Sequence, residues 1–318
     1  MKKILYLLII MMLVSTGCLN KNDNPFSDPS YVPTNRNMLK VEKISESTTN
    51  NTVTLNNVIW DYNLNNEKFN HEFHDTTIKY DNVKEAYFFA EKTLKNDKWT
   101  AGHGLLTLIM KDGHSITTAN GKKAKGLCIS IEAWRDDGVP YKMTTGLTKA
   151  YKLIYMLYTF ESEIDMTTRL MGRQIDMVKL KLNQTQLNNM LRVGIEDTLI
   201  DRTGEFYNTL TNSCITNAAD VINKVLDKDK KIRLWTIPSI IPNLKVSVPD
   251  FFVKYLVKKD LGVRYETVTA ANYKSMLAPN EFAPNLYDDG SQTDDEKEAD
   301  ALAEQDYSMA EEALNQSN

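Results

Sequence analysis

Residues 101–134 decide the fold, and they read AGHGLLTLIMKDGHSITTANGKKAKGLCISIEAW. Two β-rich runs, Leu105–Met110 and Leu127–Trp134, are joined by a segment rich in Gly, Lys and Asn. Runs of this kind on either side of a turn-rich segment are typical of neighbouring antiparallel strands. We therefore expect an antiparallel sheet at the centre of the domain.

The second of these runs has a period of two. Three apolar residues alternate with three others that include a carboxylate: Leu127, Ile129 and Ile131 against Cys128, Ser130 and Glu132. Such alternation predicts a half-buried strand with Glu132 on its more polar face.

Three segments follow this pair of strands. Residues 148–161, TKAYKLIYMLYTFE, are apolar and aromatic at mixed spacing, which fits a helix and a buried strand equally well. Residues 175–182, IDMVKLKL, predict a strand. Residues 183–199 predict a helix, because Asn183 and Gln186 stand in capping-box relation ahead of an apolar run.

Residues 206–226, FYNTLTNSCITNAADVINKVL, contain the most informative cysteine. Apolar residues recur at helical spacing after a polar TNS, so a helix should begin at Asn212 or Ser213. Cys214 then lies in the first turn, where unpaired N–H groups and the helix dipole favour a thiolate nucleophile. The alternative is that Cys214 is a small core residue, which is the commoner role of cysteine.

The first residues have the layout of a secretory signal. Lys2 and Lys3 precede an apolar run from Ile4 to Val14, and small residues lead to Cys18. The run is shorter than the roughly 20 apolar residues that a membrane-spanning helix needs. We interpret residues 1–17 as a lipoprotein signal peptide and expect lipid on Cys18 to hold the secreted protein on a membrane.

Composition divides the remaining chain into three parts. Residues 18–52 are rich in Asn, Ser, Thr and Pro and predict a flexible tether. Residues 53–287 have an ordinary globular composition and predict one α+β domain. Residues 288–318 form an acidic tail with few large apolar residues.

The charge pattern narrows the classes of partner. The net charge is −4, and basic residues are scattered along the chain, so nothing indicates nucleic acid. The four histidines form no cluster with ligand spacing, and we predict neither a metal nor a cofactor. Cys128 and Cys214 could form a disulfide in an oxidising compartment, but a nucleophilic Cys214 requires both to be free.

The order of several motifs resembles the N-terminal periplasmic domain of the Lnb-type lipoprotein N-acyltransferases. The resemblance runs from about Val58 to Gly262. The motifs that carry it are GHGLLTLIMKDG, SIEAWRDDG, YKLIYMLYTFESEIDMTTR, FYNTLTNSCITN and IRLWTIPSIIPN. This family is similar to papain-like, NlpC-type thiol enzymes in a permuted order, with the histidine strand before the cysteine helix.

The resemblance implies roles for particular residues. Cys214 would be the nucleophile, His103 the general base, and Glu132 the carboxylate that orients the imidazole. Arg135 and Arg169 match family arginines; they would bind a lipid phosphate or brace the site through Glu161, Glu163 or Asp165. Asn212 and Ser213, which directly precede the cysteine, would contact substrate or support the site.

Two functions follow from these patterns. The first is a membrane-anchored thiol acyltransferase or hydrolase of the cell envelope, periplasmic or at the cell surface, acting through a thioester on Cys214. Its expected substrates are an acyl lipid or lipoprotein, with a cell-wall peptide as the second choice. The rival is a non-catalytic surface lipoprotein on a decayed thiol-enzyme scaffold, because Ser213 and Ile215 flank the cysteine where family members commonly have Asn and Thr.

Overall fold

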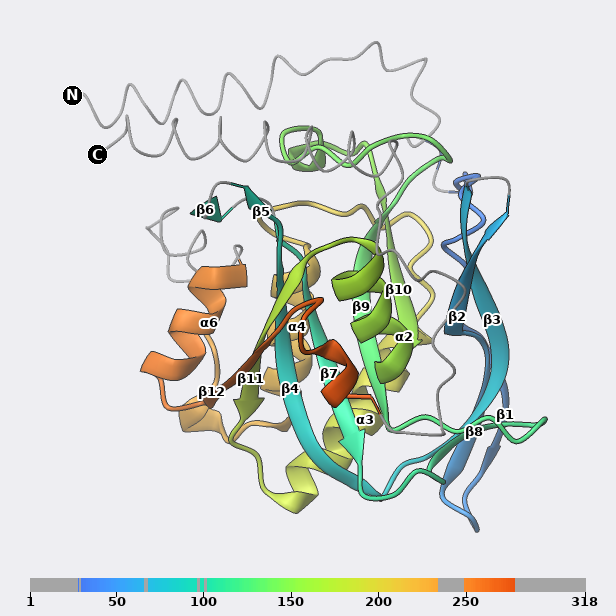
Figure 1. Cartoon of the computed structure of the whole chain (residues 1–318), viewed down its shortest axis with the longest axis vertical. Coiled ribbons are helices and arrows are strands. Elements are labelled where there is room, and N and C mark those ends of the chain that lie inside the picture. Colours follow the sequence, from blue (N-terminus) through green and yellow to red (C-terminus); the bar gives the residue numbers. More distant parts are fainter. Residues whose placement is uncertain are drawn as a thin grey trace.

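A computed structural model of the chain describes residues 28, 30–65, 68–95, 98–99, 102–233 and 249–277. The expected signal peptide, Cys18 and the acidic tail lie outside these residues. Figure 1 shows one large sheet with helices on both of its faces. The α+β class predicted from the sequence is confirmed.

The sheet contains ten strands. Its order is β12-β11-β4-β7-β9-β10-β2-β3-β8, with β1 paired to β2. The strands are β1 (Lys43–Ser47), β2 (Thr52–Asn65), β3 (Lys68–Lys79), β4 (Val83–Lys92), β7 (Gly104–Met110), β8 (Ile116–Thr118), β9 (Gly126–Trp134), β10 (Lys152–Thr159), β11 (Gln174–Leu180) and β12 (Gly262–Val268). Two shorter strands, β5 (Leu94–Lys95) and β6 (Lys98–Trp99), pair with each other.

The sheet is mixed, so the prediction of an antiparallel sheet was only partly right. β7 and β9 are antiparallel neighbours, as the sequence predicts. β10 and β2, however, run parallel where Tyr158 faces Ile59. A parallel pair needs a long connection, and the chain between Asn65 and Lys152 supplies it by forming other strands of the sheet.

Four α-helices lie in the described part of the chain: α2 (Phe160–Asp165), α3 (Gln184–Thr198), α4 (Cys214–Val225) and α6 (Pro249–Lys258). The described part also contains short helical turns: η2 (Thr145–Leu147), η3 (Met166–Leu170), η4 (Lys228–Lys230) and η5 (Tyr273–Ser275). None of the described helices has both the length and the apolar character needed to span a membrane.

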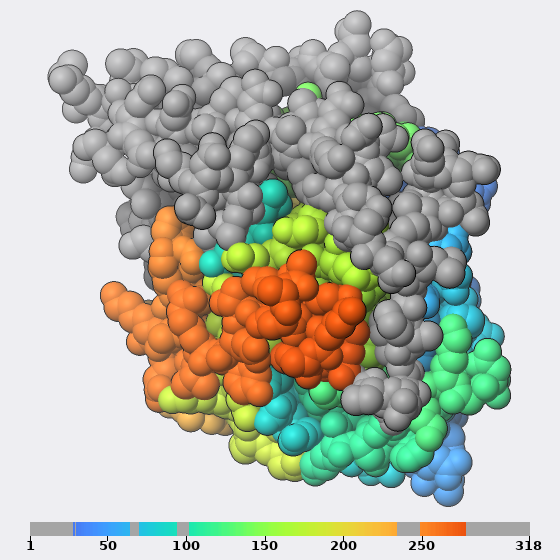
Figure 2. Space-filling view, in the orientation of Figure 1, coloured from blue at the N-terminus to red at the C-terminus, as the bar shows by residue number. Residues whose placement is uncertain are grey.

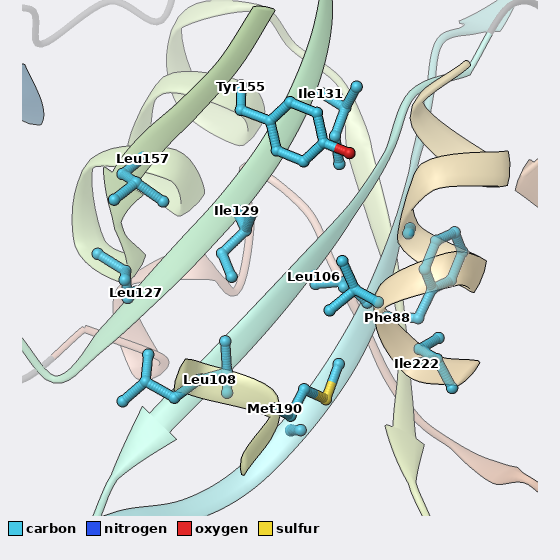
Figure 3. Packing of buried hydrophobic residues seen from close by; sticks show 14 of the residues in the cluster. Phe88, Leu106, Leu108, Leu127, Ile129, Ile131, Tyr155, Leu157, Met190 and Ile222 are labelled. Atoms are coloured by element: carbon cyan, nitrogen blue, oxygen red, sulfur yellow. The ribbon is translucent and has the colours of Figure 1, made fainter. Parts of the chain in front are cut away.

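The sheet separates two hydrophobic layers. Phe88 and Leu106 pack on the side of α3 and α4, whereas Phe89 and Leu105 pack on the side of α2. Figure 3 shows the first layer, where strand residues such as Leu106 meet residues of the helices such as Ile222. The alternation along β4 and β7 thus directs successive side chains into opposite layers.

The strand β9 is buried on both faces, which corrects the prediction of a half-buried strand. Cys128 and Ser130 are as inaccessible as Ile129 and Ile131, and Glu132 is partly covered. The cause is α2, which packs against the face that carries the more polar residues. The alternation of residue types is real, but its polar side faces protein rather than solvent.

Residues 148–161 contain both structures that their sequence allowed. Lys152–Thr159 form β10, all of it buried, and the side chain of Thr159 caps α2 by accepting from Ser162 N. A strand covered on both faces carries apolar residues at consecutive positions, which is why periodicity did not distinguish it from a helix.

The folded part begins earlier in the chain than residue 53. Lys43–Ser47, expected within the tether, form β1 and pair with β2. Tyr31 Oη donates to Asp136 at 2.7 Å, and Lys152 Nζ donates to the carbonyl oxygen of Asp28 at 2.8 Å. At the other end, residues 249–277 (orange) form a contiguous block on the face seen in Figure 2.

A candidate thiol site at the start of helix α4

Helix α4 begins at Cys214, with Ser213 as its N-cap. Ser213 Oγ accepts from Thr216 N at 3.4 Å, while Ser213 N donates to Thr216 Oγ1 at 2.8 Å, so the two residues form a capping box. The apolar face of the helix packs across β7 and β9. The predicted helix start at Ser213 is confirmed, and Cys214 lies in the first turn.

His103 immediately precedes β7, and its backbone carbonyl accepts from Glu91 N of β4 at 2.9 Å. Backbone pairing thus fixes the position of the imidazole at the end of the sheet. His103 Nε2 lies 3.0 Å from Glu132 Oε1, with about a quarter of each side chain exposed (21% and 26%). Cys214 lies close enough to this imidazole to raise the pKa of His103.

Ser130 completes this arrangement, and sequence reasoning missed it. Its Oγ lies 2.7 Å from His103 Nε2 and donates to Glu132 Oε1 at 2.7 Å. Because the Ser130 hydroxyl proton points to Glu132, the Ser130 oxygen can only accept from His103 Nε2–H. The signal was present in the sequence, because Ser130 and Glu132 are two residues apart and therefore share a face of β9.

The charges of the site favour an imidazolium. Burial opposes the charged form of His103, but the negative charges of Glu132 and Cys214 and their hydrogen bonds raise its pKa well above the ordinary value. Burial opposes the charged form of Glu132 too. The charge and hydrogen bond of His103, the bond from Ser130 and the charge of Arg135 lower the Glu132 pKa to about 2. The carboxylate and imidazolium therefore stabilise each other.

The second cysteine has a different environment. Cys128 is fully buried, and its sulfur lies 3.1 Å from Thr107 Oγ1. Burial, and then the negative charge of Glu163, raise the pKa of the Cys128 thiol well above its ordinary value. Both Cys128 and Cys214 are free, as a nucleophilic Cys214 requires. Cys128 is thus a protonated core residue, and Cys214 is the thiol beside a base.

The two predicted arginines lie in different surroundings. Arg169 forms an ion pair with Asp165, whose two carboxylate oxygens accept from Nε and Nη2 at 2.8 Å each, and Nη2 also donates to Tyr62 Oη at 2.7 Å. Of the three carboxylates considered from the sequence, Arg169 therefore contacts Asp165. Arg135 donates from Nη1 to the Val139 carbonyl at 3.1 Å and lies close enough to Glu132 to lower that pKa.

Asn212 and Ser213 support the backbone before the cysteine. Asn212 Nδ2 donates to the carbonyl of Phe206 at 2.9 Å, and Asn212 Oδ1 accepts from Asn217 at 2.8 Å. Ser213 caps the helix as described. Their side chains therefore hold the turn that presents Cys214.

Tyr207 is a second residue that the sequence analysis did not single out. Its hydroxyl is buried and donates to Cys214 Sγ at 3.7 Å. Its only sequence signal is its place seven residues before the cysteine, in the turn that leads to α4. His71, one of the histidines without a ligand cluster in the sequence, lies in β3, where burial lowers its pKa to about 3.

These features define an α+β protein in which a cysteine lies near a histidine that pairs with a glutamate at one end of the sheet. The family model of the Lnb N-terminal periplasmic domain matches residues 69–245, more than half of the chain. The protein therefore belongs to the Lnb N-terminal periplasmic domain family, as its motifs suggested, and this domain is a periplasmic one. No curated protein and no solved structure gives a significant match.

Proposed function

We propose that this protein is a cell-envelope thiol enzyme that forms a thioester on Cys214 and transfers the acyl group to water or to an amine. The observation that supports it best is the position of His103, whose Nε2 lies 3.0 Å from Glu132 Oε1 and whose pKa is raised by the nearby Cys214. A thiol activated by an imidazole that a carboxylate orients is the arrangement that nucleophilic catalysis by cysteine requires.

In the proposed reaction His103 acts first as an acid and then as a base. The Cys214 thiolate attacks the carbonyl carbon of an ester or amide, and the carbonyl electron pair moves onto oxygen. When this intermediate collapses, the bond to the leaving group breaks, and the His103 imidazolium gives its proton to the departing alcohol or amine. Water or an amine then attacks the thioester, His103 removes its proton, and the thiolate leaves.

Two features of the site suit this sequence of steps. Glu132 stabilises the imidazolium that the first step consumes and the second restores. The strand that follows His103 precedes α4 in the chain, which is the permuted order of papain-like enzymes. We infer that the domain shares their chemistry.

The tether would select the substrate by location. Lipid on Cys18 would hold the site at a membrane surface, where acyl lipids and lipoproteins are concentrated. We therefore favour an acyl ester of a lipid as the donor, with a cell-wall peptide amide as the second candidate. The periplasmic family of the domain is compatible with both.

Trapping the thioester tests the proposal. Purified protein lacking residues 1–17 and carrying Cys18→Ser is incubated with a p-nitrophenyl acyl ester or a ¹⁴C-acyl phospholipid, then analysed by intact mass. We expect one acyl group that hydroxylamine removes. Cys214→Ser and His103→Ala should abolish it, and Cys128→Ser should retain it. Acylation that is equal in Cys214→Ser would contradict the proposal and favour a non-catalytic surface lipoprotein.

A further inference from the structure

Tyr207 contacts the reacting group of the proposed site. The side chain is 6% exposed, and its hydroxyl donates to Cys214 Sγ at 3.7 Å. The backbone N–H of Cys214 also lies close enough to this hydroxyl to lower its pKa. One buried phenol therefore interacts with both the nucleophilic sulfur and the first backbone N–H of helix α4.

The neighbours of Tyr207 orient its proton. Thr209 Oγ1 donates to the carbonyl of Met143 at 3.1 Å, so its oxygen must accept from Tyr141 Oη, 2.9 Å away. Tyr141 has then used its only proton and has none to donate to Tyr207, whose ring it contacts edge to face with centroids 5.9 Å apart. The Tyr207 hydroxyl is thus free to donate to Cys214 Sγ, 3.7 Å away. A thiolate there would be a strong acceptor.

The position matches the demand of the reaction. When the thiolate attacks a carbonyl, negative charge leaves the sulfur and appears on the carbonyl oxygen one bond away. A donor that already lies beside the sulfur and the Cys214 N–H needs only a small movement to follow that charge. Tyr141 and Thr209 would hold the ring in place during this movement.

We propose that Tyr207 is a catalytic residue that donates its hydrogen bond to the Cys214 thiolate and then, together with the Cys214 N–H, to the oxyanion. This inference rests on the proposed function. The phenol keeps its proton throughout; the proton that reaches the leaving group comes from His103. Burial, and then the negative charge of Cys214, raise the pKa of Tyr207 well above its ordinary value, so it stays a donor.

The first test measures the sulfur alone. Alkylation of Cys214 by iodoacetamide is followed between pH 5 and 10 in a Cys18→Ser, Cys128→Ser background. Tyr207→Phe should slow the reaction about tenfold at pH 6, because a hydrogen bond to a charged group is lost. At pH 10 the rate should be equal or higher, since the freed thiolate is more nucleophilic. A role limited to packing would lower the rate equally at every pH.

Tyr155→Phe is the matched control. Tyr155 Oη donates to Asn217 Oδ1 of the same helix at 2.9 Å, and it is as well buried as Tyr207. The substitution removes a hydroxyl of β10 that contacts α4 at Asn217 and not at the sulfur. We expect its alkylation profile to equal that of the parent at each pH. A profile for Tyr207→Phe that also equals the parent would overturn the proposal.

The second test concerns the oxyanion. Acylation by p-nitrophenyl acetate should fall at least tenfold in Tyr207→Phe even at pH 10, where alkylation is not slowed. Acylation that rises instead would mean that the hydroxyl blocks the site, and it would also overturn the proposal. If the parent alkylates with the expected pH dependence but accepts no acyl group, the proposed function fails while the contact between Tyr207 and the thiolate stands.

Discussion

Gly104 lies directly beneath Ile215, so that a β-carbon on Gly104 would collide with the Ile215 Cδ1 methyl and with the ring of Phe88. In the chain, Gly104 directly follows His103, and Ile215 directly follows Cys214. The absence of a side chain at residue 104 is therefore what allows the histidine strand and the cysteine helix to approach each other.

Gly104→Ala should consequently separate the two residues of the site. Ile215 and Phe88 are both fully buried and have little space to move, so overpacking should destabilise the fold by about 1–3 kcal/mol. We expect a lower urea midpoint and slower alkylation of Cys214 at pH 6 in protein that remains folded. The test is equilibrium unfolding together with alkylation kinetics.

Ile215→Val supplies the control for this change. It removes the Cδ1 methyl that the new β-carbon would meet, so the double variant should recover most of the stability and reactivity lost in Gly104→Ala. Effects of the two substitutions that simply add would show that the contact between residues 104 and 215 is not the cause.

Arg169 should matter for stability and not for the chemistry. Asp165 is completely buried, and Arg169→Ala would leave its charge without the guanidinium. We expect a loss of about 3–5 kcal/mol in the free energy of unfolding, measured with urea. Arg264→Ala is the matched control: that side chain is half exposed and lies 3.6 Å from Asp176, so less than about 1 kcal/mol should be lost. Intact stability combined with lost acylation would indicate a substrate-binding arginine instead.

Glu163 and Glu91 are both buried and lie close enough for the charge of one to affect the other. Burial and then the charge of Glu91 raise the pKa of Glu163 well above the ordinary value of 4.5. The folded protein therefore keeps a proton that the unfolded chain releases, and stability falls as pH rises above about 4.5.

Glu163→Gln should remove this pH dependence, because an amide needs no proton to stay neutral. Relative to the parent, the variant should gain stability as pH rises from about 5 to 8, by at most about 1.4 kcal/mol per pH unit. Urea unfolding at a series of pH values measures it. A stability difference that stays constant over this range would show that Glu163 is not the group that holds the proton.

The elements with clear local signals were predictable from the sequence. The capping box of Asn183 and Gln186 marks the start of α3, and the polar residues before Cys214 mark the start of α4. The burial of the more polar face of β9 was not predictable. Period-two alternation shows which residues share a face but not whether α2 covers that face. The parallel contact of β10 with β2 depends on long-range pairing, which no local pattern encodes.

The site shows the same division. Cys214, His103 and Glu132 were named from motifs, and the structure brings the three together. Ser130 and Tyr207 were missed for different reasons. In the sequence Ser130 is an ordinary strand residue, because nothing there shows that His103 lies against its face of β9. Tyr207 reaches the sulfur only because the turn between residues 208 and 213 folds back on itself, with Asn208 and Asn212 exchanging two backbone hydrogen bonds.

Anchoring is tested separately from catalysis. Cys18→Ser removes the expected site of lipidation, so the full-length protein should lose incorporation of labelled palmitate and accumulate as an uncleaved precursor. Fractionation and autoradiography of cells expressing either form measure both effects. Label that persists in Cys18→Ser would contradict the lipoprotein interpretation of residues 1–18.

The ion pair of His103 and Glu132 should stabilise the protein within a definite pH window. Glu132 has a lowered pKa of about 2, so its contribution is present above the ordinary value of 4.5 and is lost as pH falls towards 2. His103 has a raised pKa, so its contribution is complete below the ordinary value of 6.5 and is lost as pH rises through the folded value. Both contributions are complete only between these two ordinary values.

Glu132→Gln should therefore cost most stability between about pH 5 and 6, by about 1–3 kcal/mol, since the amide retains a hydrogen-bonding group but not the charge. The cost should shrink towards pH 2, where the parent carboxylate is also protonated, and at alkaline pH, where His103 is neutral in both proteins. Urea midpoints from pH 2 to 10 measure this difference. The acylation rate supplies an independent readout, because a weaker imidazolium loses its proton at lower pH and the alkaline decline in activity should begin earlier in the variant. A stability cost that is uniform across the range would indicate lost packing and would contradict the ion pair as its source.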